Sequence, residues 1–382
     1  MKIGLVCPYN YVRGGGVQEC VRAMHDRLKK MGHEVRVITP LPLGYNGHTP
    51  VDTIFLGSST DFHSPLATTT QLSASVNDQE IEEMLAREQF DILHFHEPWV
   101  PMLSQQILKR SNAVHVATFH AKLPESVMAR TMAKVVTPYT KGILNYIDEF
   151  TAVSGAAAEY VRTLSDEPIT FIPNGINLHH YKPATRAAKA LAVKEHGKKT
   201  IFYVGRLEKR KGVKHLLKAY ALLAKEHHDV RLVIGGDGPD RAKLEQYVED
   251  ANIPDVTFAG FLSEAEKLHY LQTSDLFCSP ALYGESFGIV LLEAMATGLV
   301  TVAGDNSGYT SVLKELGSIS VVDPEHTEDF MKRLELLLYE KTLRELWKAW
   351  AKTYVKQFDY DIVVTQYETV YKKALKKHGK KQ

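Results

Sequence analysis

The chain has 382 residues, of which 44% are hydrophobic and 24% are charged. Because domains usually span roughly 100–200 residues, this length predicts two or three domains, and the composition excludes disordered and fibrous proteins. No apolar run reaches the ~20 residues of a membrane-spanning helix, since Glu293 interrupts the longest run, residues 288–303. The start of the chain turns polar too early for a signal peptide, and its three cysteines form no motif. We therefore expect a cytoplasmic protein with reduced thiols.

The formal net charge of +1 conceals an uneven distribution. Residues 1–180 carry 15 Lys and Arg against 18 Asp and Glu, a balance of −3, and the remainder carries 31 against 27, a balance of +4. The last eleven residues contain no acid and six lysines: Lys372, Lys373, Lys376, Lys377, Lys380 and Lys381. The chain thus ends in a basic tail on a slightly acidic body.

Short β-rich runs alternate with longer helical patterns, which is typical of βαβ units and a mostly parallel sheet. In the first half the predicted strands are 2–6, 34–39, 53–56, 91–95, 114–118, 150–153 and 170–172. Between the first two strands a helix is predicted over 17–31, because Lys29 and Lys30 suit a helix C-terminus and Gly32 suits its end.

The pattern breaks near Pro173-Asn174-Gly175, a strong turn signal, and residues 180–199 are rich in Ala and Lys without a strand. Strands are then predicted at 200–205, 231–234, 256–258, 276–279, 300–303 and 320–322, and a last helix at 361–377. We expect an α/β protein with two Rossmann-like domains, 1–178 and 179–358, facing each other across a cleft. Residues 359–382 would form a helix that packs back towards the first domain, followed by the lysine-rich tail.

A glycine-rich loop, with Gly14, Gly15 and Gly16, lies between the first strand and the first helix. Glycines at such a turn let backbone amides approach a phosphate at the positive end of the helix. The loop is not the G-x-G-x-x-G dinucleotide fingerprint, which disfavours a dehydrogenase. A tight turn without a ligand therefore explains the loop as well as phosphate binding does.

The string His94-Phe95-His96-Glu97 invites a metal site. On a strand, however, His94 and His96 share one face while Glu97 points the other way, and no clean third ligand is visible. Structural histidines and no metal are therefore expected. His120 follows the strand 114–118 at its carboxyl end, where open α/β sheets bind ligands, so a functional and a structural role are both open there.

A basic segment follows the first strand of the second half, with four cations within six residues: Arg206, Lys209, Arg210 and Lys211. Such a run is usually a solvated face. At the carboxyl end of a first strand it suits an anion instead, because Arg offers a planar fork and Lys a point charge. The segment therefore favours phosphate binding without a metal.

Residues 284–296 form the most specific pattern. Glu285 precedes an obvious helix, and Glu293 lies within it among apolar neighbours, where an unpaired carboxylate is costly. Vicinal ribose hydroxyls would satisfy Glu293, and the backbone amides of 287–289 would meet a diphosphate at the helix start. The alternative, a capping acid plus a salt-bridged helix acid, fits this arrangement less well.

Taken together, these segments resemble the retaining glycosyltransferases of family four, which have the GT-B fold. The resemblance runs over nearly the whole chain. It is carried by the glycine loop, the 173–175 turn, the Gly205-Arg206…Lys211-Gly212 segment and the Glu285-x7-Glu293 motif. Within the family, the chain is most similar to bacterial phosphatidylinositol mannosyltransferases that use GDP-mannose. This similarity rests on the strings at 7–9, 15–18, 94–98, 117–120, 210–212 and 284–290.

The resemblance implies roles for individual residues. Arg206 and Lys211 would hold the donor diphosphate, Glu285 would contact the sugar hydroxyls, and His120 would lie beside the transferring sugar. These four are the implied catalytic residues. The remaining implied donor contacts are Gly15, Gly16, Phe287, Gly288 and Ile289, with Phe261 and Leu262 flanking the base and Glu293 on the ribose. The implied acceptor residues are Tyr9, Gln18 and Arg210.

The implied reaction moves a hexose, mannose from GDP-mannose in the first place, to a hydroxyl acceptor with retention. No cofactor or nucleic acid is required, and the acceptor would be a phosphatidylinositol-type or other glycerolipid at the cytoplasmic membrane face. Those enzymes carry a basic amphipathic helix in the first domain, whereas the corresponding residues here, 77–85, are acidic. The basic tail would then supply membrane attraction, at ~1 kcal/mol per lysine near the surface.

Three alternatives are open. One is transfer of glucose or another hexose from a UDP-sugar to a lipid or saccharide. The others are a nucleotide-sugar epimerase of similar two-domain shape and a non-catalytic nucleotide-sugar binding protein. Product analysis separates them, because an epimerase yields a changed sugar nucleotide without any acceptor.

Overall fold

The computed structural model describes residues 1–12, 14–63, 69–73, 76–100, 102–122, 137–185 and 197–379, with the backbone alone at 59–63 and 69–73. Arg13 of the glycine loop and the tail lysines Lys380 and Lys381 lie outside these residues. The chain divides into two compact units: unit 1 comprises Met1–Gly175 with Tyr360–Gln382, and unit 2 comprises Ile176–Asp359.

Unit 1 is built on an eight-stranded sheet in the order β4-β3-β2-β1-β5-β6-β7-β8. The strands are β1 (Lys2–Val6), β2 (Glu34–Pro42), β3 (Thr53–His63), β4 (Thr69–Ser73), β5 (Ile92–His96), β6 (Val114–Phe119), β7 (Glu149–Ala152) and β8 (Ile169–Phe171). The pairings are parallel except that between β3 and β4, which is antiparallel. The alternating pattern of the first half thus predicts its parallel strands correctly and misses only β4.

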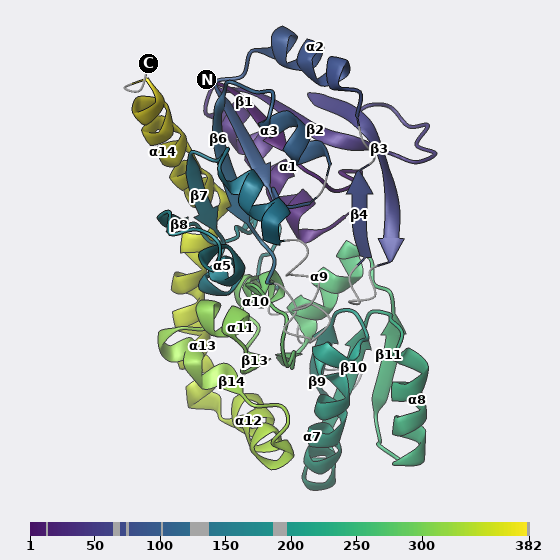
Figure 1. The fold of residues 1–382 in the computed structure, drawn as a ribbon. Coiled ribbons are helices and arrows are strands. Elements are labelled where there is room, and N and C mark those ends of the chain that lie inside the picture. Colours follow the sequence, from purple (N-terminus) through teal and green to yellow (C-terminus); the bar gives the residue numbers. More distant parts are fainter. Residues whose placement is uncertain are drawn as a thin grey trace. The chain divides into compact units, whose positions relative to one another are not determined.

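Helices cover this sheet (Figure 1). They are α1 (Gly16–Lys30), α2 (Asp78–Glu88), α3 (Leu103–Leu108), α5 (Gly155–Arg162) and α14 (Tyr360–His378). The last helix belongs to unit 1, where Val363, Tyr367 and Tyr371 pack with the buried face of α1 in one hydrophobic core. The helical spacing of apolar residues near the end of the chain predicts this helix within one residue at either end. Among the described residues no helix is both long and apolar enough to cross a membrane.

Unit 2 contains a six-stranded, wholly parallel sheet in the order β11-β10-β9-β12-β13-β14. Its strands are β9 (Lys199–Val204), β10 (Val230–Gly235), β11 (Val256–Gly260), β12 (Leu276–Ser279), β13 (Thr301–Gly304) and β14 (Val321–Val322). The α-helices are α7 (Val213–Glu226), α8 (Arg241–Asp250), α9 (Glu264–Thr273), α10 (Ile289–Ala296), α11 (Ser307–Val312), α12 (Thr327–Tyr339) and α13 (Lys341–Tyr354). Three 3-10 turns complete the unit: η1 (Lys209–Lys211), η2 (Glu315–Ser320) and η3 (Val355–Phe358). Both units therefore have the predicted α/β architecture of mostly parallel strands joined through helices.

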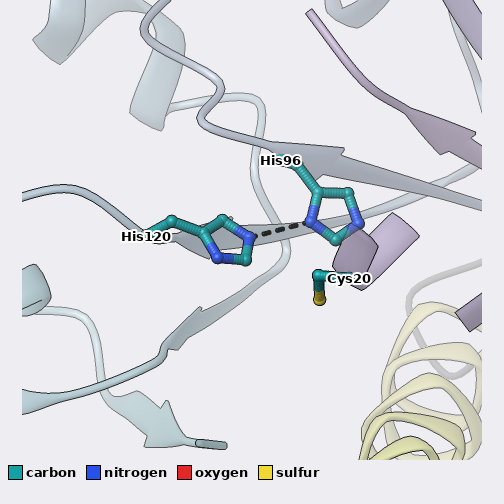
Figure 2. Close-up of side chains that lie close together, drawn as sticks. All are labelled: Cys20, His96 and His120. Atoms are coloured by element: carbon teal, nitrogen blue, oxygen red, sulfur yellow. Dashed lines mark hydrogen bonds between the residues drawn. The ribbon is translucent and has the colours of Figure 1, made fainter. Parts of the chain in front are cut away.

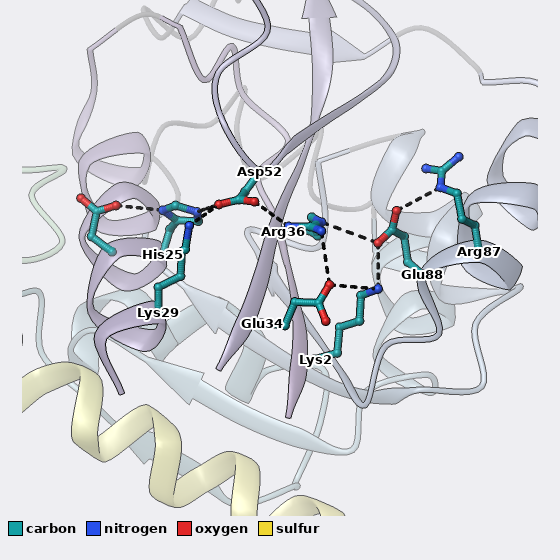
Figure 3. A network of polar contacts seen from close by, with 9 residues as sticks. Lys2, His25, Lys29, Glu34, Arg36, Asp52, Arg87 and Glu88 are labelled. Carbon is teal, nitrogen blue, oxygen red and sulfur yellow. Dashed lines mark hydrogen bonds and ion pairs between the residues drawn. The ribbon is translucent and has the colours of Figure 1, made fainter. Parts of the chain in front are cut away.

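A polar network lies at the amino end of the unit 1 strands (Figure 3). Asp52, which has a φ of 60°, accepts from Lys29 Nζ at 2.5 Å and from Arg36 Nη1 at 2.5 Å, and His25 Nε2 lies 3.3 Å away. The pKa of Asp52 is lowered, chiefly by the hydrogen bond from Lys29. Asp52 thus joins helix α1 to strand β2.

Replacing Asp52 with asparagine is expected to lower the free energy of unfolding of unit 1 by about 1 kcal/mol at pH 7. Asparagine tolerates the positive φ, so the loss reports on the charge. Because the folded pKa of Asp52 is depressed, its contribution is present at neutral pH and lost as the pH falls through that folded pKa. Urea unfolding measures the effect, and Glu167→Gln, at an exposed position of unit 1 outside the network, is the control expected to change little.

Candidate active site

The glycine loop of unit 1 leads into α1, which begins at Gly16. Gln18 lies in the first turn of the helix, and its Nε2 donates to the backbone oxygen of Asn10 at 3.3 Å. The backbone oxygen of Tyr9 accepts from Thr39 Oγ1 at 2.8 Å. These contacts place Tyr9, Gln18 and the amides at the start of α1 in one region, next to the carboxyl end of β1.

The carboxyl ends of β5 and β6 bring His96 and His120 together. His96 Nδ1 and His120 Nε2 are 2.9 Å apart, and the two rings stack with centroids 5.2 Å apart. Burial lowers the pKa of His120 to about 4, an effect that the Asn174 side chain opposes. His120 is therefore held as a neutral ring at neutral pH, able to accept or donate a hydrogen bond but not to carry a charge.

Glu97 anchors the backbone around His120. Its Oε1 accepts from the backbone N–H of His120 and from that of Ala121, each at 2.5 Å. The residue is fully buried, has a φ of 52° and has a pKa raised by burial to about 8. A non-glycine residue in this conformation persists only where its surroundings fix it. Glu97 therefore positions the turn that carries His120, a role that the sequence pattern did not reveal.

His94 belongs to the core. Its Nδ1 lies 2.7 Å from the hydroxyl of Tyr371 on α14, and its Nε2 lies 2.6 Å from Thr118 Oγ1 on β6. The ring stacks on that of His96 with centroids 4.3 Å apart, which agrees with the prediction that the two histidines share a face of the strand. His94 thus ties β5, β6 and α14 together and is a structural histidine.

In unit 2 the basic segment follows β9 and contains the turn η1. Gly212 ends that turn with a φ of 69°, and a Cβ there would lie 2.0 Å from the backbone oxygen of Pro280. Only glycine fits this close approach. The close approach of Gly212 to Pro280 brings Arg210 and Lys211 beside the loop after β12, and this loop carries Glu285.

Glu285 is the centre of an ion-pair cluster. Its Oε1 accepts from Lys211 Nζ at 2.7 Å and from Arg210 Nη1 at 2.8 Å. Glu208, whose side chain is only 6% exposed, lies between the two arginines, 2.6 Å from Arg210 Nε and 3.5 Å from Arg206 Nε. Arg206, Arg210 and Lys211 thus contact two carboxylates, so these side chains are not a simple solvated basic run. The cluster of five charges has a net charge of +1, which is available to an anion.

Glu293 lies on α10 and already has protein partners. Its Oε1 accepts from the hydroxyl of Tyr181 at 2.9 Å and from Lys267 Nζ at 3.0 Å. The salt-bridged helix acid, which the sequence analysis ranked second, is therefore present at this position. Because α9 supplies Lys267, burial of Glu293 does not by itself require a ligand. A ribose contact by Glu293 remains a proposal.

Five further expected donor residues lie in unit 2, after β11 and at the start of α10. Gly288 precedes α10 with a φ of 100°, and a Cβ there would meet the ring of Tyr309 at 2.7 Å. Phe287 is buried, so only its backbone is available, and Ile289 begins the helix. Phe261 follows β11 and is 86% exposed. Leu262 packs over Gly235, where an added Cβ would lie 2.5 Å from Leu262 Cδ1.

Solved structures share this fold over nearly the whole chain. Sucrose-phosphate synthase from Thermosynechococcus elongatus is similar with a TM-score of 0.77 at 20% identity, over 97% of this chain and 98% of that one. The Anabaena protein HepE in complex with UDP-glucose is similar with a TM-score of 0.74 at 16% identity, over 97% and 99%. The fold is that of the GT-B glycosyltransferases.

Sequence comparison then gives the family. Residues 14–180 match the family described as Glycosyltransferase Family 4, and residues 186–354 match Glycosyl transferases group 1. Over 389 residues the chain is 30% identical to the phosphatidyl-myo-inositol mannosyltransferase of Mycolicibacterium smegmatis, covering 97% of this chain and 93% of that protein. The alpha-monoglucosyldiacylglycerol synthase of Streptococcus pneumoniae is 26% identical over 333 residues, covering 82% and 74%. The chain belongs to glycosyltransferase family 4 and is a hexosyltransferase.

Proposed function

We propose that the enzyme transfers mannose from GDP-mannose, with retention, to a hydroxyl of a phosphatidylinositol-type glycerolipid. The observation that carries this proposal is the contact of Lys211 and Arg210 with Glu285, within 2.8 Å. It sets Lys211, a cation suited to a diphosphate, beside a carboxylate suited to sugar hydroxyls. Similarity to phosphatidyl-myo-inositol mannosyltransferases over nearly the full chain supports the mannosyl donor and the lipid acceptor.

The donor is assigned mainly to unit 2. Arg206 and Lys211 would neutralise the diphosphate, helped by the backbone amides of 287–289 at the start of α10. Glu293 would take the ribose, and residues 261–262 would flank the base. Tyr9 and Gln18 of unit 1, with Arg210 of unit 2, are assigned to the acceptor. Gly15 and Gly16 are assigned to the donor, and His120 to the transferred sugar.

The chemical step breaks the bond between the anomeric carbon and the diphosphate oxygen. A bond from the acceptor oxygen to the same carbon forms on the same face of the sugar, and the acceptor proton passes to the leaving phosphate. Glu285 is held by two cations, so we assign it to orienting the sugar rather than to attacking it. Arg206 and Lys211 stabilise the negative charge that develops on the leaving diphosphate.

Initial rates of nucleoside diphosphate release test the donor and acceptor. GDP-mannose and UDP-glucose are each supplied with vesicles containing phosphatidylinositol, with vesicles containing diacylglycerol, or with neither. We expect release to be fastest with GDP-mannose and to require phosphatidylinositol. Release that is independent of any acceptor, or a preference for UDP-glucose, would contradict the proposal.

The second candidate is transfer of glucose from UDP-glucose to a diacylglycerol-type lipid. It is favoured by the similarity to the Streptococcus pneumoniae synthase named above. The same rate measurements distinguish the two candidates, because this one predicts UDP-glucose as the faster donor with diacylglycerol vesicles.

Membrane attraction is assigned to the basic tail. Deleting residues 372–382 would cut into α14 and remove buried Ala374, and Lys373 and Lys377 lie 3.3 and 3.4 Å from Glu149. Point substitution is therefore the better test. The test changes exposed Lys376, together with Lys380 and Lys381, to glutamine. We expect the binding free energy to anionic vesicles, measured by sedimentation, to weaken by about 1 kcal/mol for each lysine near the surface. Neutral phosphatidylcholine vesicles are the control, and unchanged sedimentation with anionic vesicles would remove the tail from the proposal.

A further inference from the structure

Three side chains of unit 1 that bind soft metal ions well lie together in its core (Figure 2). One ligand atom each from Cys20, His96 and His120 can be chosen so that all three lie within 4.8 Å of one another, and all three residues are buried. They come from three different elements: Cys20 from the first half of α1, His96 from the end of β5 and His120 from the turn after β6. The sequence pattern at 94–97 offered no third ligand, whereas the fold brings Cys20 and His120 to His96.

The two histidines of this group already contact each other through ring nitrogens. His96 uses Nδ1 towards His120, whereas its Nε2 is buried without a hydrogen-bond partner among the described residues. A buried polar atom without a partner costs free energy comparable to a lost hydrogen bond. The side chain is completely shielded from solvent. Metal binding through His96 Nδ1 would not supply a partner for Nε2, so the proposed site rests on the clustering of the three ligand atoms.

We propose that Cys20, His96 and His120 form a binding site for a zinc-type divalent cation, and that the occupied site inhibits sugar transfer. The inhibitory half rests on the proposed function, because it requires His120 beside the transferred sugar. The metal-binding half does not.

The donor set fits this class of ion. Zinc prefers thiolate and imidazole ligands, with a Zn–S bond of about 2.3 Å and Zn–N bonds of about 2.0–2.1 Å. Tetrahedral geometry at those lengths separates ligand atoms by about 3.3–3.6 Å. The ring nitrogens, 2.9 Å apart, therefore need to move slightly apart, and the sulfur already lies within 4.8 Å of each. Three protein ligands would leave a fourth position for water, as in open zinc sites.

Binding of the ion releases one proton from the site. The Cys20 thiol gives up its proton to solvent, and the thiolate and one nitrogen of each imidazole donate electron pairs to the ion. The hydrogen bond between the rings is lost, and the proton in it moves to the other nitrogen of its own ring. No electron is transferred, and no co-reactant is needed.

Occupation would fix His120 to the ion. The His120 ring could then no longer move to contact the sugar. The positive charge of the ion would also change the electrostatic potential around the ring, which is neutral without the ion. Magnesium is expected to have no such effect, because it prefers oxygen ligands in octahedral geometry. The site is thus distinct in its ligand chemistry from a magnesium site.

The test uses the full chain with metal buffers that set the free zinc concentration. Wild type is compared with Cys20→Ser, and Cys278→Ser, another buried cysteine but in unit 2, is the matched control. Cobalt is added separately, because thiolate-bound cobalt has a strong charge-transfer absorption that does not depend on enzymatic activity. Thermal melting of Cys20→Ser shows whether it folds, and Cys20→Ala replaces it if it does not.

We expect the cobalt–thiolate band in wild type and Cys278→Ser but not in the Cys20 variant. Zinc should inhibit wild type and Cys278→Ser reversibly, and half-inhibition of the Cys20 variant should need at least about tenfold more zinc. Absence of the band in wild type, or equal zinc sensitivity of the Cys20 variant, would overturn the site. A band without inhibition would overturn the inhibitory half alone. If no donor supports transfer, the proposed function fails, and the cobalt spectrum still decides whether the site exists.

Discussion

Replacing Lys211 with alanine is expected to lower kcat for sugar transfer by about 10²–10³-fold, with a smaller change in KM. Its ammonium lies 2.7 Å from Glu285, where the proposed function places the diphosphate. Removing one preorganised group that stabilises charge developing in the transition state typically costs this much. Initial rates with the preferred donor and a saturating acceptor measure the effect.

Lys209→Ala is the matched control, because Lys209 lies in the same 3-10 turn and is exposed. It removes the same charge from the same segment and is expected to retain most of the wild-type rate. Equal losses in the two variants would mean that Lys211 acts only through the general charge of the segment. A near-wild-type rate for Lys211→Ala would refute its assigned role.

The second large effect is a loss of stability in mild acid. Burial lowers the pKa of His94 to about 3 and that of His120 to about 4. At these two imidazoles the unfolded chain therefore binds more protons than the folded one below the ordinary histidine pKa of about 6.5, an effect that the raised pKa of Glu97 opposes in part. These neutral histidines contribute their full stabilisation above pH 6.5. We expect the free energy of unfolding to fall by roughly 3 kcal/mol or more as the pH drops from 6.5 to 4.

Hydrogen exchange of the β5 and β6 amides in denaturant follows this loss in unit 1 without interference from unit 2. His94→Gln is the informative variant, since it removes one buried imidazole outside the assigned active site. It is expected to be less stable at pH 7, yet to show a shallower decline between pH 6.5 and 4. His228→Gln, at an exposed position, is the control for losing an imidazole. A slope for His94→Gln identical to that of wild type would refute the account.

Most of the fold could be predicted from the sequence because parallel strands buried on both faces read as apolar runs. β1 and β12 have the predicted bounds, and the other predicted strands agree within three residues except β3, which continues seven residues beyond its predicted end. Strand β4 was not predicted, because Thr69–Ser73 has neither an apolar run nor a clear alternation. It is held by antiparallel pairing with β3, an interaction that local sequence does not encode.

The candidate site was harder to predict because its polar residues are paired across elements. Burial of Glu293 was correctly inferred, but its partner Lys267 lies 26 positions earlier on another helix. Glu208 lies within the basic segment, and its low exposure and its contacts with two arginines follow only from the fold. An acid inside a basic segment after a strand is the signal that could have identified it.

The roles of Glu97 and Cys20 also depend on contacts with residues distant in the sequence. Glu97 was considered only as a metal ligand, whereas its carboxylate serves two backbone amides more than 20 residues further along the chain. Cys20 belongs to no motif, and only the packing of α1 on the sheet brings it towards His96 and His120. Contacts of this kind depend on tertiary structure, so neither spacing nor residue type predicts them.

The central claim is that this chain moves a hexose from a nucleoside diphosphate to a lipid hydroxyl. Mass spectrometry of the products from a donor-by-acceptor screen tests it most directly, with GDP-mannose and UDP-glucose against phosphatidylinositol and diacylglycerol. The predicted result is phosphatidylinositol heavier by one hexose, formed from GDP-mannose together with free GDP. An altered sugar nucleotide formed without acceptor, or no lipid product with any donor, would contradict the claim.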